Sequence, residues 1–273
     1  MSILGIFNGY ILVSDMDGTL INGERKISKD DRDAIEYFTR NGGLFTIATG
    51  RMLHSANRFA KDLNLSLPII LYNGSKVYDY SKDEVVLEYS LEEERKKVIN
   101  KLLEDRDDIG IEVYSEENIY IFKSCKYTDR FTKLGYDVIY DIDEDEDVWN
   151  KKWTKILIVG DKDTIDYLED NFKEKYDSEI PIRSGDKYLE VVPKYTSKGQ
   201  ALKDLMKKYE LDKFKLVTVG DNMNDKELIE EAHYGFVVKN GNERLLKLAN
   251  YIAPSNNDSP ISYIVKFIEN NII

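Results

Sequence analysis

Short apolar runs alternate with segments of helical spacing in the first part of the chain. A serine at position 28 with an acidic residue three positions later resembles a capping box, and Asn41-Gly42-Gly43 is a typical helix stop. The apolar runs on either side of this helix, and one further on, have the length and composition of buried strands; they cover residues 10–15, 44–49 and 68–72. The order strand, helix, strand predicts a βαβ unit and therefore a parallel sheet.

The pattern changes at about residue 84 and returns to its first form after Pro193. The intervening segment predicts a long polar helix, a hairpin around Glu116-Glu117-Asn118 and further strands. Beyond it, strands are predicted at 215–221 and 234–239, with helices around 198–209, 223–232 and 242–249. We therefore predict an α/β protein in which a Rossmann-like parallel-sheet core, residues 1–83 and 190–273, is interrupted by an inserted α+β domain, residues 84–189.

Composition and charge narrow the possible functions. No apolar run approaches the roughly 18 residues of a membrane span, and the single cysteine, Cys125, cannot form an internal disulfide, so we expect a soluble, cytoplasmic protein without membrane contact. The formal net charge of −12 disfavours nucleic acid as a partner. It would also repel phosphorylated small molecules, unless a metal ion or a helix N-terminus reverses the local field.

Acidic side chains follow two of the predicted strands. Asp15 and Asp17 come at the end of the first strand, and Asp221 ends a later strand, followed by Asn224 and Asp225. The carboxyl ends of parallel strands form the edge where α/β proteins bind ligands, so hard oxygen ligands from the two loops would hold Mg²⁺ there. A single aspartate at a strand end more often caps a turn, but the run Asp-Met-Asp-Gly-Thr fixes four residue types at once.

Two other strand and helix ends carry candidate phosphate contacts. Thr49 closes a strand, and Gly50 exposes a backbone N–H before a helix begins, an arrangement suited to a phosphoryl oxygen. Lys198 is predicted in the first turn of a helix, where its charge opposes the helix dipole. An ordinary surface lysine is the alternative interpretation of that position.

Four stretches together resemble the motifs of the haloacid dehalogenase-like superfamily of phosphohydrolases, in that family's order: DMDGT, IATGR, TSKG and GDNMND. The stretches YNGSKVYD (72–79) and LEVVPKYTSKG (189–199) resemble its Cof-type branch of sugar phosphatases, which carries a large α/β cap after the third core strand. One departure is the loop at 255–262, SNNDSPIS, where the branch has an sNDeDG-like sequence.

The resemblance implies roles for individual residues. It makes Asp15 the nucleophile, forming an aspartyl-phosphate, and Asp17 the acid that protonates the leaving oxygen and later activates water. Mg²⁺ would be held by Asp15, the backbone carbonyl of Asp17 and Asp221, while Asp225 would support the metal shell or Lys198. The positions implied for binding the phosphoryl group are Met16, Thr49, Gly50, Lys198 and Asn224.

The expected function is that of a Mg²⁺-dependent phosphatase of small phosphorylated metabolites, with sugar phosphates as the favoured substrates and the cap closing to exclude water. We expect a monomer or a weak homo-oligomer. The alternatives are a phosphotransferase such as a phosphohexomutase, or a non-catalytic sensor of a phosphorylated ligand, which the intact motifs disfavour. We assign no role to His54 or His233, and we expect the acidic run at 140–149 to be solvated rather than a calcium loop.

Overall fold

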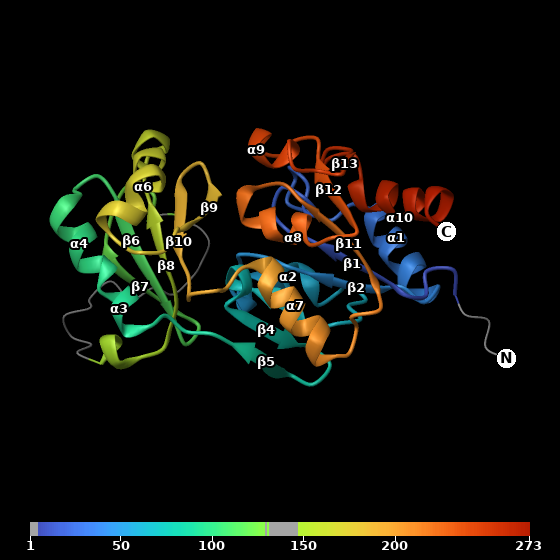
Figure 1. Ribbon diagram of the computed structural model, residues 1–273, viewed down its shortest axis with the longest axis horizontal. Coiled ribbons are helices and arrows are strands. Elements are labelled where there is room, and N and C mark those ends of the chain that lie inside the picture. Colours follow the sequence, from blue (N-terminus) through green and yellow to red (C-terminus); the bar gives the residue numbers. More distant parts are fainter. Residues whose placement is uncertain (1–4, 129, 131–146) are drawn as a thin grey trace. The chain divides into compact units, whose positions relative to one another are not determined.

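The chain divides into two compact units in a computed structural model that describes residues 5–128, 130 and 147–273 (Figure 1). We call residues 1–88 with 197–273 the core unit, and residues 89–196 the insert. The predicted boundaries at 84 and 190 therefore move to 89 and 197. No helix in the described ranges is long and apolar enough to cross a membrane.

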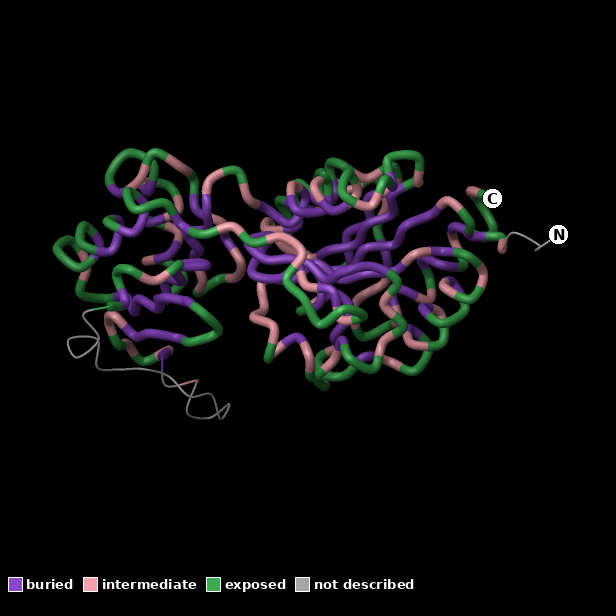
Figure 2. Tube along the Cα trace, turned by 90° about the horizontal axis from the view of Figure 1, so that it is seen from below, coloured by how far each residue is buried: buried purple, intermediate pink, exposed green. Residues whose placement is uncertain are grey.

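The core unit is built on a parallel five-stranded sheet in the order β13-β12-β11-β1-β2. All five residues of β1 are buried, so both faces of the sheet are covered, as the parallel arrangement requires (Figure 2). On one face, Ile11 and Val13 pack in an apolar cluster with Leu202 and Leu205 of α7. The strands are β1 (Tyr10–Ser14), β2 (Leu44–Ile47), β11 (Lys215–Gly220), β12 (Tyr234–Val238) and β13 (Tyr251–Ala253).

Helices of the core unit begin close to where the sequence predicts them. Ser28 caps the first helix by accepting a hydrogen bond from the backbone N–H of Asp31, and the helix ends before Asn41, which confirms the predicted βαβ unit. The helix pairs α1 with α10 and α7 with α8 pack side by side. The helices are α1 (Lys29–Arg40), α2 (Leu53–Ala60), α7 (Lys198–Lys208), α8 (Lys226–Glu230), α9 (Glu243–Leu246) and α10 (Pro260–Asn271), with the 3₁₀ turns η1 (Tyr72–Gly74) and η3 (Met223–Asp225).

A second, three-stranded antiparallel sheet completes the core unit. It consists of β3 (Ile69–Leu71), β4 (Lys76–Asp79) and β5 (Glu84–Glu88) in that order, and a single parallel bridge between Ala48 and Ile70 joins it to the end of β2. The strand at 84–88, which the sequence analysis assigned to the insert, thus belongs to the core unit because it is hydrogen-bonded to β4.

The insert has an antiparallel sheet in the order β7-β6-β8-β10-β9 and its own apolar core. The predicted hairpin is confirmed, whereas the predicted long helix is two shorter ones, α3 and α4. Most of the acidic run at 140–149 lies outside the described residues. The elements are α3 (Glu93–Lys96), α4 (Val98–Asp105), β6 (Gly110–Ser115), β7 (Asn118–Lys123), η2 (Val148–Asn150), β8 (Trp153–Val159), α6 (Lys162–Lys175), β9 (Ile182–Gly185) and β10 (Tyr188–Val191).

Candidate active site

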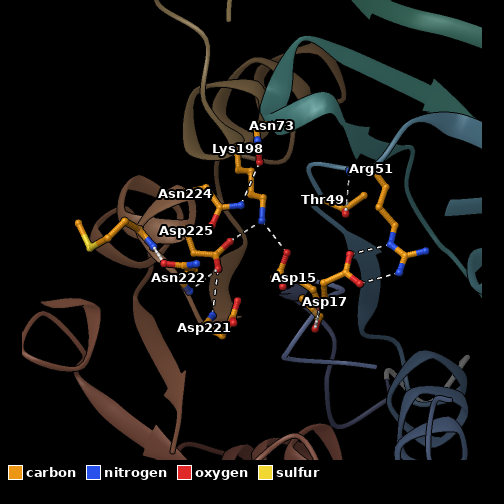
Figure 3. Close-up of polar contacts among 12 residues, drawn as sticks. Asp15, Asp17, Thr49, Arg51, Asn73, Lys198, Asp221, Asn222, Asn224 and Asp225 are labelled. Carbon is orange, nitrogen blue, oxygen red and sulfur yellow. Dashed lines mark hydrogen bonds and ion pairs between the residues drawn. The ribbon is translucent and has the colours of Figure 1, made fainter. Parts of the chain in front are cut away.

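The two acidic clusters predicted from the sequence meet at one edge of the parallel sheet (Figure 3). β1 and β11 are neighbours with Ser14 opposite Val219, so the residues that follow these strands, Asp15 and Asp221, emerge side by side. The N–H of Asp15 continues the ladder by donating to the carbonyl of Val219 at 2.9 Å. Asp15, Asp221 and Asp225 each offer a carboxylate oxygen, and these oxygens lie within 4.8 Å of one another.

Lys198 is the first residue of α7 and is fully buried. Ser197 caps this helix by accepting from the N–H of Gln200 at 3.0 Å, which fixes where the helix starts. The ammonium of Lys198 donates to Asp15 Oδ1 at 2.5 Å and to Asp225 Oδ1 at 2.6 Å. Because the side chain is buried, the alternative of a surface lysine is wrong. The two carboxylates offset the cost of burying its charge at the positive end of a helix.

Asp225 uses both of its carboxylate oxygens within the protein. Oδ1 accepts from Lys198, and Oδ2 accepts from the backbone N–H groups of Asp221 at 2.9 Å and Asn222 at 3.2 Å. The sequence left open whether Asp225 supports a metal shell or Lys198. Its contacts join it to Lys198 and to the main chain that carries Asp221.

Among the described residues, the cluster contains three carboxylates and one ammonium. Burial raises the pKa of Asp15 to about 7, with Lys198 opposing the rise and Asp225 adding to it. Burial, followed by repulsion from Asp15 and Asp225, raises the pKa of Asp221 to about 9. Burial disfavours the charge of Lys198, but its two carboxylate neighbours outweigh this effect and raise its pKa. The site is thus short of positive charge.

A divalent cation fits this deficit. Asp15 Oδ2 is buried and has no hydrogen-bond partner among the described residues, which is costly for a carboxylate oxygen unless a ligand completes it. Of the carboxylate oxygens in this cluster, Asp15 Oδ2 and those of Asp221 remain for a cation, since those of Asp225 are engaged. Hard oxygen donors of this kind suit Mg²⁺.

The turn after Asp17 depends on Gly18. Its φ of +78° lies in the left-handed region, and a Cβ at this position would lie 2.4 Å from Asp221 Oδ2. A side chain at this position would therefore strain the backbone and displace either the turn or the carboxylate of Asp221. Asn240 holds the same turn from the other side by donating to the carbonyl of Gly18 at 2.8 Å.

The carboxylate of Asp17 points to Arg51 rather than to Asp15 (Figure 3). Arg51 donates from Nε to Asp17 Oδ2 and from Nη2 to Asp17 Oδ1, each at 2.6 Å, and this is a bidentate ion pair. Its Nη1 donates to the hydroxyl of Ser55 at 3.1 Å, and its guanidinium lies over the ring of Phe59. The sequence analysis gave Arg51 no role. Its position directly after Thr49 and Gly50, at the end of a predicted strand, could have indicated that it lies at the site.

The predicted phosphate-binding positions lie around this cluster. The hydroxyl oxygen of Thr49 accepts from the N–H of Arg51 at 3.1 Å, which leaves its hydrogen available for donation. Asn224 donates from Nδ2 to Asn73 Oδ1 at 3.0 Å, and its own Oδ1 is buried without a partner among the described residues. The side chain of Met16 is fully buried, so only its main chain is available to a ligand.

Asn73 is the second residue that the sequence analysis did not assign. It is fully buried and adopts φ +54°, and the Asn-Gly pair after a predicted strand was a signal for such a left-handed turn.

The loop at 255–262, which departs from the family pattern, contacts the segment that follows the turn at Gly18. Asn256 donates from Nδ2 to the carbonyl of Ile21 at 2.9 Å, and Asn257 Oδ1 accepts from the N–H of Gly23 at 2.9 Å. His233 has a structural contact, since its Nδ1 accepts from the N–H of Leu216 at 3.0 Å.

The site combines a buried carboxylate held by a lysine with a second acidic strand end, and hydroxyl and amide donors lie around them. Such an arrangement suits an enzyme that acts on a phosphoryl group. Comparison with known proteins gives the same class. Residues 12–265 match the model of the haloacid dehalogenase-like hydrolase family, and the chain belongs to this family. Within it, the chain is a phosphatase, and the predicted family and enzyme class are confirmed.

Relatives cover nearly the whole chain. A Streptococcus pyogenes protein, M6_Spy0533, whose name provisionally calls it a phosphatase, is 29% identical over 94% of this chain and 97% of its own. The 5-amino-6-(5-phospho-D-ribitylamino)uracil phosphatase YwtE of Bacillus subtilis is 25% identical over 92% of this chain and 95% of its own. The crystal structure of TM0651 from Thermotoga maritima has a TM-score of 0.75 at 28% identity, covering 94% of this chain and 96% of that one.

Proposed function

We propose that this phosphatase hydrolyses small phosphorylated metabolites of the sugar-phosphate class, with Mg²⁺, through a phosphorylated Asp15. The observation that carries the proposal is the state of Asp15, whose Oδ1 is held by the buried Lys198 while Oδ2 lacks a partner in the described structure. The name of the relative YwtE, a phosphatase of a phosphorylated ribityl compound, supports the substrate class.

Asp15 and Asp221 would hold the metal through the carboxylate oxygens described above, with the backbone carbonyl of Asp17 as a third ligand. When bound, Mg²⁺ supplies positive charge that offsets the repulsion between a phosphate dianion and the attacking carboxylate. The neighbouring ammonium of Lys198, 2.5 Å from Asp15, supplies the same kind of stabilisation from the protein itself.

In the first step, a carboxylate oxygen of Asp15 forms a bond to phosphorus, the bond from phosphorus to the leaving oxygen breaks, and Asp17 transfers its proton to that oxygen. In the second step, Asp17 takes a proton from water, the water oxygen bonds to phosphorus and the bond to Asp15 breaks. Thr49, Gly50 and Asn224 would orient the phosphoryl oxygens.

Asp17 cannot perform these transfers while both of its oxygens accept from Arg51. The ion pair must open, at least at one oxygen, before Asp17 carries a proton to a leaving group. The side chain of Asp17 is 56% exposed, so this rotation is not hindered by packing.

The test is phosphate release from a panel of phosphorylated metabolites, with Mg²⁺ and with EDTA. We expect turnover of at least one sugar phosphate, its loss in EDTA and its return with Mg²⁺. Full activity in the chelator would contradict the metal-dependent mechanism, and turnover confined to phosphates that are not sugar derivatives would contradict the substrate class.

A further inference from the structure

The turn that joins β3 to β4 has an unusual backbone. Tyr72, Asn73 and Gly74 follow one another with φ values of +51°, +54° and +104°. A left-handed conformation is uncommon for residues other than glycine, and it is a clear outlier for a bulky residue such as tyrosine. Such strain persists only where the surrounding contacts impose it, and it concentrates at functional sites.

The main chain of this turn is bound to the loop that carries Thr49. The N–H of Tyr72 donates to the carbonyl of Arg51 at 3.1 Å, and the N–H of Asn73 donates to the carbonyl of Thr49 at 3.0 Å. These two bonds require the N–H groups to point at the loop, and the left-handed conformation of the turn provides this direction.

The same turn touches the other two phosphate-binding segments. The side chain of Asn73 accepts from Asn224 Nδ2 at 3.0 Å and lies so close to Gly50 that a Cβ there would be 3.0 Å from Asn73 Nδ2. A Cβ on Gly74 would lie 2.2 Å from the carbonyl oxygen of Ser197, the residue before Lys198. The turn therefore packs against all three segments, far apart in sequence, that carry Thr49, Lys198 and Asn224.

We propose that Asn73 is a positioning residue for phosphate binding: its buried amide fixes the orientation of the Asn224 amide. The inference rests on the proposed function, because Asn224 is a phosphate contact only if that function holds. Within the described structure, the Asn224 amide makes no other hydrogen bond, and its Oδ1 has no partner there. Without Asn73, the Asn224 amide would rotate freely and would lose entropy on each binding event.

The variant Asn73→Gly separates this role from backbone strain, since glycine accepts φ +54° without cost but lacks the amide. We expect the dissociation constant of inorganic phosphate, measured by calorimetry with saturating Mg²⁺, to rise about tenfold. KM for a sugar phosphate should rise by a similar factor, with a smaller change in kcat. The melting temperature should fall in either case, because a buried amide and its hydrogen bond are lost. Phosphate affinity is therefore the deciding measurement, since a merely structural asparagine would leave it unchanged.

Glu210→Gly is the matched control. Glu210 is exposed, has φ +55° and follows the far end of α7, about 17 Å along the helix from Lys198. This change relieves the same kind of strain, so it should raise the melting temperature without altering phosphate affinity.

A double variant tests whether Asn73 acts through Asn224. Asn73→Gly combined with Asn224→Ala should bind phosphate no more weakly than Asn224→Ala alone. Additive losses, or unchanged phosphate affinity in Asn73→Gly, would overturn the inference while the proposed function stands. If the wild-type protein binds phosphate but hydrolyses no ester, the proposed function fails and the binding data still decide the role of Asn73. A wild-type protein that binds no phosphate overturns both.

Discussion

Buried charges occur in both units, but they are arranged differently. In the core unit, Asp15 and Asp225 both pair with the ammonium of Lys198, and the carboxylate of Asp221 lies in the same cluster. In the insert, the buried side chains of Lys155 and Glu190 form one ion pair at 2.9 Å. There, too, Glu112 accepts from both terminal nitrogens of Arg130, at 2.6 and 2.7 Å.

The balance of charge in a buried ionic cluster separates one that stabilises the fold from one that forms a functional site. In the insert the named carboxylates and cations are equal in number, so the network needs no further ion. In the core unit, burial raises the pKa of Asp15 and of Asp221, and the neighbouring carboxylates add to the rise. Asp15 Oδ2 has no hydrogen-bond partner in the described part of the chain. An unbalanced cluster of this kind is expected where a cation and a substrate complete the site.

The largest effect should follow from Asp15→Asn. An amide is a poor nucleophile and a weaker metal ligand, so we expect kcat to fall about 10⁴-fold or more for every substrate. Phosphate release with Mg²⁺ measures this loss, and unchanged circular dichroism controls for folding. Retained turnover would show that Asp15 is not the nucleophile.

Asp17→Asn should have a smaller effect that depends on the leaving group. A sugar alkoxide needs a proton as it leaves and a nitrophenolate does not, so kcat/KM should fall about 10² to 10⁴-fold more for a sugar phosphate than for p-nitrophenyl phosphate. Single-turnover release of the leaving group is the measurement, because slowed dephosphorylation of Asp15 would lower the steady-state kcat for both substrates. Equal losses would show that Asp17 is not the acid.

Deletion of the insert should change selectivity more than folding. The insert has its own apolar core, so joining Glu88 to Ser197 by a short linker should leave a folded core unit with weak Mg²⁺-dependent turnover of p-nitrophenyl phosphate. Preference among sugar phosphates should be lost, as a substrate panel would measure.

The matched control is a deletion at the boundaries that the sequence suggested, residues 84–189. It removes β5 from its pairing with β4 and should melt at a lower temperature. A truncated protein that keeps the full-length preference would show that the insert does not determine specificity.

The stability of the metal-free protein should depend on pH in the direction set by the raised pKa values. Between about pH 4 and the folded-state pKa values of about 7 for Asp15 and 9 for Asp221, the folded protein keeps protons that the unfolded chain has released. Stability should therefore fall as the pH rises, by up to about 1.4 kcal/mol per pH unit for each proton. Urea unfolding in EDTA measures this slope, and saturating Mg²⁺ should flatten it; an equal slope with and without Mg²⁺ would contradict the cation site.

The smallest effect on turnover should come from the insert's ion pair. Glu190→Gln leaves the buried ammonium of Lys155 facing an amide, so we expect a loss of about 3 kcal/mol in unfolding free energy with kcat/KM for p-nitrophenyl phosphate within about twofold. Asp221→Asn is the counterpart in the core unit and should stabilise the metal-free protein at neutral pH, because an amide removes the cost of keeping this carboxyl protonated in the folded state. Changes of the same sign in both variants would mean that the two clusters do not differ as described.

The sequence by itself determined the elements of the core unit and the chemistry of its strand ends. The apolar runs before Asp15 and Asp221 predicted buried parallel strands, and that topology alone places both residues at one edge. The helix start at Lys198 was readable because Ser197 is a local capping signal. Local patterns of this kind depend only on near neighbours in the chain, so they survive in the folded structure.

Only the tertiary structure decided which side chains meet. The boundary of the insert moves because β5 pairs with β4. The sequence of a largely exposed strand such as β5 does not predict which strand it will bond to. Arg51 reaches Asp17 across 34 positions, and Asn73 reaches Asn224 across 151. Such contacts depend on where the backbone directs each side chain, and a left-handed residue such as Asn73 acquires its direction only when the surrounding segments have packed against it.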